Sequence, residues 1–175
     1  LILDLPKHGF INLHFSLLPA YRGAAPAQRA LQNGETSTGV SVFQLEKGMD
    51  TGPIYSQRTV AIDPKWRTFE LLQALALEGP AAVRDALTMI SRGQSPSVQQ
   101  GEVSLAPKIT KQDAFLNFSN EAKTIVDAIR AFTYEPGAWC NWKNESFKIT
   151  SAVVVGDKDI PPAEIVFDGQ RVFVG

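Results

Sequence analysis

A turn-rich stretch, residues 91–104, divides this sequence into two parts with different hydrophobic patterns. It contains Gly93, Pro96 and Gly101 and few large apolar residues, as linkers between domains commonly do. Before it, runs with the period of a strand alternate with runs with the period of a helix, which predicts an α/β unit. After it, one amphipathic helix precedes several short β-prone runs, a spacing typical of a small barrel or sandwich.

Each part has its own expected elements. In the first part we expect strands at 10–14, 39–45 and 54–60, a helix that begins at Pro26 and ends before Gly34, and helical structure over 69–89. The pair Gly79-Pro80 predicts that this last segment is split into two helices. In the second part we expect a helix at 121–132 and strands at 138–142, 147–155, 164–167 and 171–174.

Composition excludes few functions, but it indicates the class of protein and its cellular compartment. Hydrophobic residues make up 44% and charged residues 20% of the chain, with a formal net charge of −1, which is ordinary for a soluble globular protein. No apolar run is long enough to span a bilayer, and the start at Leu1 has neither a basic leader nor an initiator Met, so we expect the middle of a longer protein. Cys140 is the single cysteine, which fits a reducing compartment and, with two histidines, disfavours a structural zinc site.

Two polar residues of the first predicted strand, Asn12 and His14, are candidates for chemistry. Because they are two positions apart, both side chains leave the same face of the strand. An amide can donate to the oxygen that becomes negative in acyl transfer, and an imidazole can stabilise that oxygen or move a proton. Asp50 lies on a glycine-flanked turn from which its carboxylate could approach His14 and fix its tautomer. By spacing alone, a structural histidine and a turn-forming aspartate remain the more common explanations.

The literal sequence around these residues is more specific. Residues 12–26 read Asn-Leu-His-Phe-Ser-Leu-Leu-Pro-Ala-Tyr-Arg-Gly-Ala-Ala-Pro, which closely resembles the Asn-x-His-x-Ser-x-Leu-Pro-x-x-x-Gly signature of the 10-formyltetrahydrofolate-dependent formyltransferases. The turn at 48–52, Gly-Met-Asp-Thr-Gly, resembles the second catalytic segment of that family and falls at the family's spacing. Phe15 departs from the family, which commonly has a small residue or proline there; we expect it to point away from the polar pair and to alter packing only.

The resemblance implies roles for individual residues. Asn12 and His14 match the catalytic pair of the family, and Asp50 matches its catalytic aspartate. The residues that match the tetrahydrofolate-lining loop are Ser16, Leu17, Leu18 and Pro19, and those of a possible substrate loop are Arg22 and Gly23. Residues 44–49 would lie near the pteridine, mainly through their backbone. The formyl donor implied is 10-formyltetrahydrofolate, and no metal is implied.

Within the family, residues 23–30 resemble the methionyl-tRNA enzymes. Four strings of the second part are similar to the OB-like C-terminal domain of those enzymes: Ala106–Lys111, Leu116–Ser119, Ile129–Phe132 and Pro136–Trp139. This implies formyl transfer to the α-amine of initiator methionyl-tRNA, in translation initiation, by a monomer without a membrane partner in the cytoplasm or an organellar matrix. The alternatives are a sugar-nucleotide formyltransferase, a formyltetrahydrofolate hydrolase or dehydrogenase module, or a non-catalytic binding fragment.

The resemblance also sets the expected fold class and domain plan. We expect an α/β protein in which residues 1–92 are the C-terminal part of a Rossmann-like catalytic domain, 93–104 a linker, and 105–175 a truncated OB-like β-barrel. Few side chains should bridge residues before 91 and after 111. A protein limited to residues 1–175 should be weakly active or inactive, because part of the folate pocket would lie upstream.

Most other basic and aromatic residues are expected to be structural. Arg29 and Arg58 are interpreted as solvated or structural more readily than as anion contacts, while Arg22 is balanced between the two. The second part holds nearly equal numbers of basic and acidic residues, so tRNA binding follows from the resemblance and not from charge. The three tryptophans are expected in core or interface packing and not as base-stacking platforms: Trp66, Trp139 and Trp142.

Overall fold

The computed structural model describes residues 2–156 and 159–175, with a short 3-10 helix, η1 (Ile2–Asp4), near the start. Its largest sheet has three antiparallel strands in the order β1 (Ile11–His14), β2 (Ser37–Gln44) and β3 (Ile54–Ala61). The interior residues of β2 are buried, because β1 and β3 flank it and helix α2 (Thr68–Ser91) packs against the sheet. The three predicted strands are confirmed, and the described strands of this sheet contain no parallel pair.

Helix α2 packs against the sheet, a shorter helix contacts α2, and α2 differs from the prediction. Helix α1 (Pro26–Gln32) begins at Pro26 and is followed by Gly34 with a φ of 68°, as expected. The predicted break at Gly79-Pro80 is wrong, because α2 continues through Pro80 as one helix. Gly79 is buried, and a Cβ there would lie 2.8 Å from Leu13 Cδ2, so this glycine permits close contact between α2 and β1.

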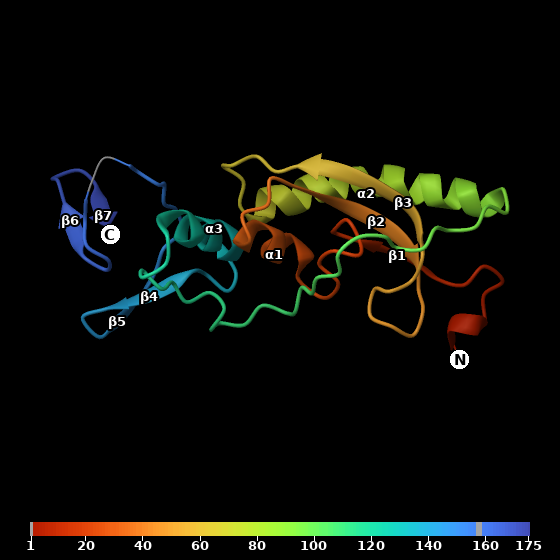
Figure 1. Cartoon of the computed structure of the whole chain (residues 1–175), viewed down its shortest axis with the longest axis horizontal. Coiled ribbons are helices and arrows are strands. Elements are labelled where there is room, and N and C mark those ends of the chain that lie inside the picture. Colours follow the sequence, from red (N-terminus) through yellow and green to blue (C-terminus); the bar gives the residue numbers. More distant parts are fainter. Residues whose placement is uncertain (1, 157–158) are drawn as a thin grey trace.

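The turn-rich segment after α2 is not a free spacer. Figure 1 shows it running back along the sheet from the end of α2 towards the second part of the chain. Ser97 exchanges both backbone hydrogen bonds with Ile54 at the start of β3, at 2.7 and 2.8 Å. Further along, Ala106 N–H donates to Arg22 O at 2.7 Å, and Ala106 O accepts from Ala25 N–H at 3.1 Å. The segment is therefore fastened to both the sheet and the loop that follows β1.

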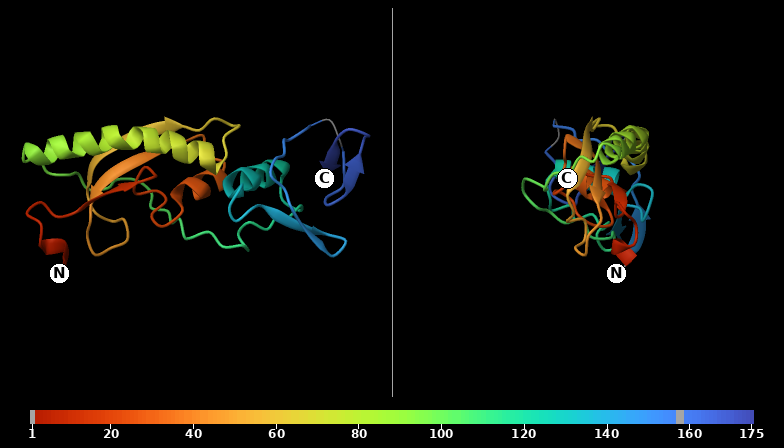
Figure 2. Two further views of the ribbon diagram at one scale, coloured as in Figure 1. Left: turned by 180° about the vertical axis from the view of Figure 1, so that it is seen from behind. Right: turned by 90° about the vertical axis from the view of Figure 1, so that its right-hand side faces the viewer.

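The second part contains one helix and two separate hairpins. Its elements are α3 (Ala122–Phe132), β4 (Trp139–Trp142), β5 (Glu145–Lys148), β6 (Ile165–Phe167) and β7 (Val172–Val174). Strand β4 pairs with β5 and strand β6 with β7, and the described residues form no closed barrel. The strand predicted over 147–155 is wrong beyond Lys148, since the described residues 149–155 contain no regular element. Figures 1 and 2 place the two ends of the chain at opposite ends of an elongated molecule.

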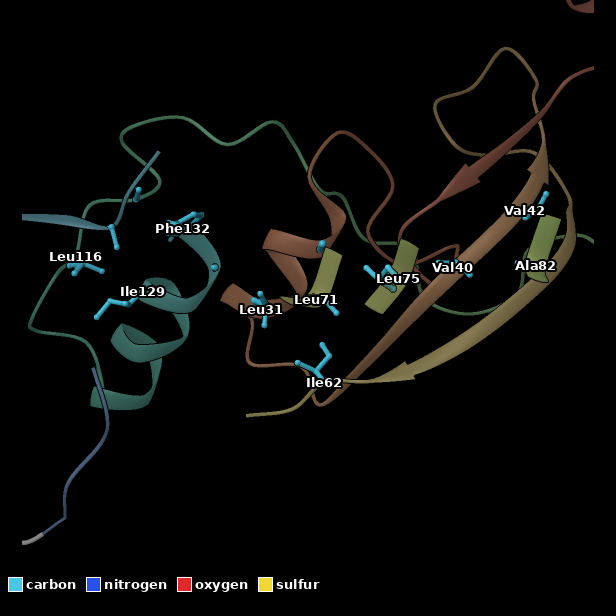
Figure 3. Packing of buried hydrophobic residues seen from close by; sticks show 14 of the residues in the cluster. Leu31, Val40, Val42, Ile62, Leu71, Leu75, Ala82, Leu116, Ile129 and Phe132 are labelled. Carbon is cyan, nitrogen blue, oxygen red and sulfur yellow. The ribbon is translucent and has the colours of Figure 1, made fainter. Parts of the chain in front are cut away.

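One hydrophobic core runs through both parts, so the prediction that few side chains bridge them was wrong. Leu31 of α1 and Leu71 of α2 are fully buried in the same cluster as Ile129 and Phe132 of α3. Figure 3 shows these side chains in one continuous row from the sheet to α3. The apolar stripe of α3 was visible in the sequence, but a stripe does not identify its partner, which proves to be α1.

Polar contacts reinforce this junction. Arg29 Nη2 lies 3.1 Å from Asp113 Oδ1, and Thr68 Oγ1 donates to Ala131 O at 2.5 Å. Arg130 Nε donates to Trp66 O at 2.7 Å. Because each of these bonds joins residues before 91 to residues after 111, the two parts fold against each other rather than hanging on a flexible connection.

Candidate active site

Strand β1 presents the two polar residues that the sequence singled out. Asn12 pairs with Phe43 and His14 pairs with Ser41 across the antiparallel ladder, so both side chains leave the same face of the sheet. His14 is buried, with 6% of its surface exposed, whereas Asn12 is exposed. The arrangement places an accessible amide beside a buried imidazole, as the spacing predicted.

His14 is held from three sides. Its Nε2 lies 2.9 Å from Tyr21 O, its Nδ1 lies 3.7 Å from Asp50 Oδ2, and Phe43 meets the ring edge-on with centroids 6.4 Å apart. A carbonyl only accepts, so the hydrogen bond at Nε2 requires a hydrogen on that nitrogen. The contact with Asp50 is attractive when Nδ1 also carries a hydrogen. The expected approach of Asp50 to His14 is confirmed.

The Asp50 turn is fixed by backbone geometry. Asp50 has a φ of 54°, in the left-handed region that aspartate tolerates better than most residues. Its Oδ2 accepts a hydrogen bond from Gly23 N–H at 2.7 Å, so the same oxygen faces both His14 and the loop after β1. A Cβ on Gly52 would lie 1.7 Å from Gln44 O, so only glycine allows the turn to close this tightly.

The predicted folate loop lies mostly inside the protein. Ser16, Leu18 and Pro19 are buried and Leu17 is half-buried. Ser16 Oγ donates to Ala20 O at 2.6 Å, while Ser16 O accepts from Ser41 Oγ at 2.6 Å. The hydroxyl and carbonyl of Ser16 are therefore engaged within the protein. The backbone of Leu17 and Leu18 is engaged as well, because Leu17 O accepts from Ala20 N–H, Leu18 N–H donates to Ser41 Oγ and Leu18 O accepts from Gln57 Nε2.

The predicted substrate loop is held by a residue that the sequence analysis missed. Arg22 Nε and Nη2 donate to Gln99 Oε1 at 3.2 and 2.6 Å, and Gly23 donates to Asp50. Gln99 Nε2 in turn donates to Asp50 O and Gly52 O at 2.8 and 2.7 Å. A single glutamine in a turn-rich segment has no local signal that would have marked it.

Tyr21 supplies the carbonyl next to His14 from an unusual backbone position. Its φ is 60°, and its hydroxyl donates to Glu35 Oε1 at 2.6 Å and accepts from Asn33 Nδ2 at 3.0 Å. Burial, followed by the hydrogen bond to Glu35, raises the pKa of Tyr21 to about 12, so this hydroxyl stays protonated near neutral pH. The bonds at the hydroxyl hold the residue in a conformation that most side chains avoid.

Arg29 and Arg58 form ion pairs within the protein, as expected for structural arginines. Arg29 pairs with Asp113, and Arg58 pairs with Glu78 and Asp85 at 3.5 and 2.9 Å. The hydrogen bond to Asp85 is the main cause that raises the pKa of the Arg58 guanidinium above its usual value. Neither arginine lies among the contacts of His14 and Asp50.

The tryptophans divide between core and surface. Trp66 and Trp139 pack against the hydrophobic core, as expected. Trp142 is 46% exposed at the end of β4, with Lys143 Nζ 4.5 Å from its ring centroid, so the packing expectation was wrong for this residue. A hairpin end exposes a side chain that composition alone would place inside.

The described residues contain neither a cluster of metal-binding side chains nor a helix that could span a membrane. They contain no group of three or more His, Cys, Asp or Glu side chains arranged to hold a metal ion. Among residues 2–156 and 159–175, no helix combines the length and apolar character required to cross a membrane.

Known sequences resemble this chain over nearly its whole length. Formyl transferase models match residues 1–87, and models of the formyl transferase C-terminal domain match residues 108–175. A methionyl-tRNA formyltransferase of Pseudarthrobacter chlorophenolicus is 43% identical over 99% of this chain and 57% of its own length. One of Salinispora tropica is 42% identical with the same coverage, 99% and 57%. The chain thus spans little more than half the length of these curated relatives.

Solved structures share the fold. Methionyl-tRNA formyltransferase from Clostridium thermocellum matches with a TM-score of 0.66 and 17% identity, over 94% of this chain and 66% of that one. The N-formyltransferase from Helicobacter canadensis, solved with folinic acid and dTDP-3-aminofucose, matches with a TM-score of 0.74 and 21% identity, over 94% and 61%. With the family models and the identities above, these likenesses lead to one conclusion: the chain belongs to the formyl transferase family.

Proposed function

We propose that this chain carries the catalytic residues of a methionyl-tRNA formyltransferase, which transfers the formyl group of 10-formyltetrahydrofolate to the α-amine of methionyl-initiator-tRNA. The observation that carries the proposal is the site itself, in which buried His14 lies between the carboxylate of Asp50 and the carbonyl of Tyr21, beside exposed Asn12. The 40–43% identity to methionyl-tRNA formyltransferases supports this acceptor over others.

The chemistry needs stabilisation of charge and movement of one proton. The amine lone pair attacks the formyl carbon, and the carbonyl electrons move to oxygen. Collapse of this intermediate breaks the bond from the formyl carbon to the donor nitrogen, and the proton lost by the amine is the one that the donor nitrogen gains. The formyl group passes directly from the donor nitrogen to the amine, so no covalent enzyme intermediate is required.

Three residues divide this work. The amide of Asn12 is exposed and donates to the developing oxyanion, a contact that can contribute on the order of a hundred- to a thousandfold in rate. When the substrate replaces Tyr21 O, the single hydrogen of neutral His14 lies on Nδ1 towards Asp50, and the free lone pair of Nε2 takes up the amine proton. Asp50 attracts the hydrogen on the other nitrogen, Nδ1, and so orients the ring with Nε2 towards the amine.

The ligands are assigned to separate parts of the chain. The segment Ser16–Pro19 supports one wall of the folate site, and the exposed loop before Asp50 faces the folate. Residues 1–92 then form the catalytic part, 93–104 the connecting segment and 105–175 an OB-like part that faces the tRNA. The protein acts in the cytoplasm as a monomer, with no metal and no membrane partner.

A direct test compares three acceptors. The longest natural form of the protein that contains residues 1–175 is incubated with 10-formyltetrahydrofolate and either methionyl-initiator-tRNA, a dTDP-amino sugar or no acceptor. Formylation of the tRNA alone is expected; turnover of the sugar would support the sugar enzymes, and hydrolysis without acceptor would support the hydrolase alternative. Folate binding without any turnover would leave a binding module and overturn the proposal.

Variants connect the activity to the site. Asn12→Ala and His14→Ala should each lower kcat by about a hundredfold or more. His8→Ala is the matched control, because it removes an exposed histidine that has no hydrogen bond or ion pair with His14 or Asp50. A protein limited to residues 1–175 should remain weakly active or inactive, since correct placement of donor and amine can contribute roughly 7–11 kcal/mol. Equal rates for the short and long forms would contradict that expectation.

A further inference from the structure

Gln99 makes four hydrogen bonds that meet at the site, although it lies far along the chain from both loops. Its Nε2 donates to Asp50 O and Gly52 O at 2.8 and 2.7 Å. Its Oε1 accepts from Nε and Nη2 of Arg22 at 3.2 and 2.6 Å. The carboxamide thus uses both of its donor hydrogens and both acceptor positions on the two loops that frame His14.

The environment of Gln99 separates it from its neighbours. Gln99 is half-buried, whereas Val98 and Gln100 on either side are exposed. Its backbone is placed by the Ser97–Ile54 bridge on one side and by Ser104 on the other, whose carbonyl accepts from Arg22 N–H at 2.9 Å. The segment is therefore held on both sides of Gln99, whose side chain faces the two loops.

Those contacts control the position of Asp50. Its carboxylate is held by Gly23 N–H, and its main chain is held by Gln99, which also binds the neighbouring Arg22. Without the carboxamide, the carbonyls of Asp50 and Gly52 lose their donor, and only the bond to Gly23 still joins the turn to the loop. The separation of 3.7 Å between Asp50 Oδ2 and His14 Nδ1 then has weaker support.

We propose that Gln99 is a positioning residue, whose carboxamide sets the Asp50 turn against the Arg22–Gly23 loop and so fixes the carboxylate at His14. The kinetic consequence rests on the proposed function, whereas the structural consequence does not. Gln99 touches no reacting atom and acts through Asp50. Its loss should therefore lower kcat and leave the KM for either substrate nearly unchanged.

The kinetic test uses two substitutions and a neighbouring control. Gln99→Ala removes all four bonds, while Gln99→Glu keeps an acceptor for Arg22 and removes both donors to the turn. Each should lower kcat by roughly 10- to 100-fold, because a displacement of about 1 Å can cost a hundredfold. Gln100→Ala removes an exposed glutamine one position away and should match the wild type. A kcat within twofold of Gln100→Ala for both Gln99 variants would overturn the proposal.

A spectroscopic readout tests the same idea without turnover. The ring ¹⁵N signals of His14 are compared in the wild type, Gln99→Glu, Gln100→Ala and Asp50→Asn, with exposed His8 as an internal reference. The signals in Gln99→Glu should shift in the direction that Asp50→Asn defines, and those in Gln100→Ala should not. Unchanged His14 signals would sink the positioning role. If the wild type formylates no tRNA, the proposed function fails, and this comparison still decides the role of Gln99.

Discussion

The two ends of the molecule contain strands of similar sequence character but very different burial. At the sheet end, residues 38–43 of β2 are buried. The hydroxyl of Ser41 in this strand accepts from Leu18 N–H and donates to Ser16 O. At the other end, every residue of β5 and β6 is exposed, and Phe173 is the buried residue of β7. A β-prone run becomes core only when other elements cover it, so the sheet end should carry most of the stability and most of the positional precision.

The largest expected effect tests this difference in stability with two phenylalanines. Phe132 is fully buried where α3 meets α1, whereas Phe167 of β6 is 66% exposed. Phe132→Ala should lower the free energy of unfolding by about 3–5 kcal/mol, through lost burial and a residual cavity. Phe167→Ala should change it by no more than about 0.5 kcal/mol.

Urea denaturation followed by both tryptophan fluorescence and circular dichroism checks this prediction. Because the core is continuous, the transitions from the two probes should coincide in the wild type. Equal losses for the two variants would show that the hairpin end contributes as much as the junction. Separate transitions would restore the independent domains that the sequence predicted.

A second prediction concerns positional precision at the site. In Gly52→Ala, the new Cβ would lie 1.7 Å from Gln44 O, so the Asp50 turn must move. Formylation should fall by about a hundredfold, equivalent to about 2.7 kcal/mol in activation free energy. Gly156→Ala is the control, since a Cβ there meets nothing within 4 Å. A steady-state assay of both variants decides the matter, and near-normal activity in Gly52→Ala would mean that the turn tolerates displacement.

The smallest expected effect concerns the ion pair across the junction. Arg29→Gln should lower the free energy of unfolding by about 1 kcal/mol at neutral pH, because Asp113 loses a partly exposed partner. Hydrogen bonds from Thr110, and then Arg29, hold the pKa of Asp113 below the ordinary value of an aspartate. This stabilisation is present above that value and is lost as the pH falls through the lower folded pKa.

The difference between wild type and Arg29→Gln should therefore shrink as the pH is lowered below about 4. Thermal or urea denaturation between pH 3 and pH 7 measures it. Asp113→Asn provides a matched background, in which the effect of the substitution at Arg29 should not depend on pH, since only its bonds to Gln32 and Pro107 are then lost. A difference that grows in acid would contradict the assignment of the charge interaction.

Local sequence predicted most of the elements, whereas the contact of Asp50 with His14 was expected from the resemblance to the family. Alternation identified the strand of Asn12 and His14, and glycines marked the turn that brings Asp50 to the imidazole. These signals work because neighbouring residues decide strand direction and turn conformation. The helix through Pro80 was missed because tertiary packing, including the approach of Gly79 to Leu13, outweighs the local cost of a proline.

The contacts that could not be predicted all join distant segments. Gln99 has an ordinary setting in the sequence, and only the folded chain brings it between Arg22 and the Asp50 turn. The junction of α1 with α3 is similar, since two amphipathic stripes do not reveal that they face each other. The surface position of Trp142 depends on which neighbours cover the hairpin. In each case, the missing information is a partner far away along the chain.

The return of the segment after α2 also sets an order of events during synthesis. Gln99 lies 49 positions after Asp50, so a ribosome completes the turn and its flanking strands before the side chain that fastens them exists. At about 5–20 residues per second, this interval is on the order of 2–10 seconds. The nascent chain therefore contains Asn12, His14 and Asp50 before it contains the side chain that aligns them. A polypeptide released in that interval would have these residues but would lack the hydrogen bonds from Gln99.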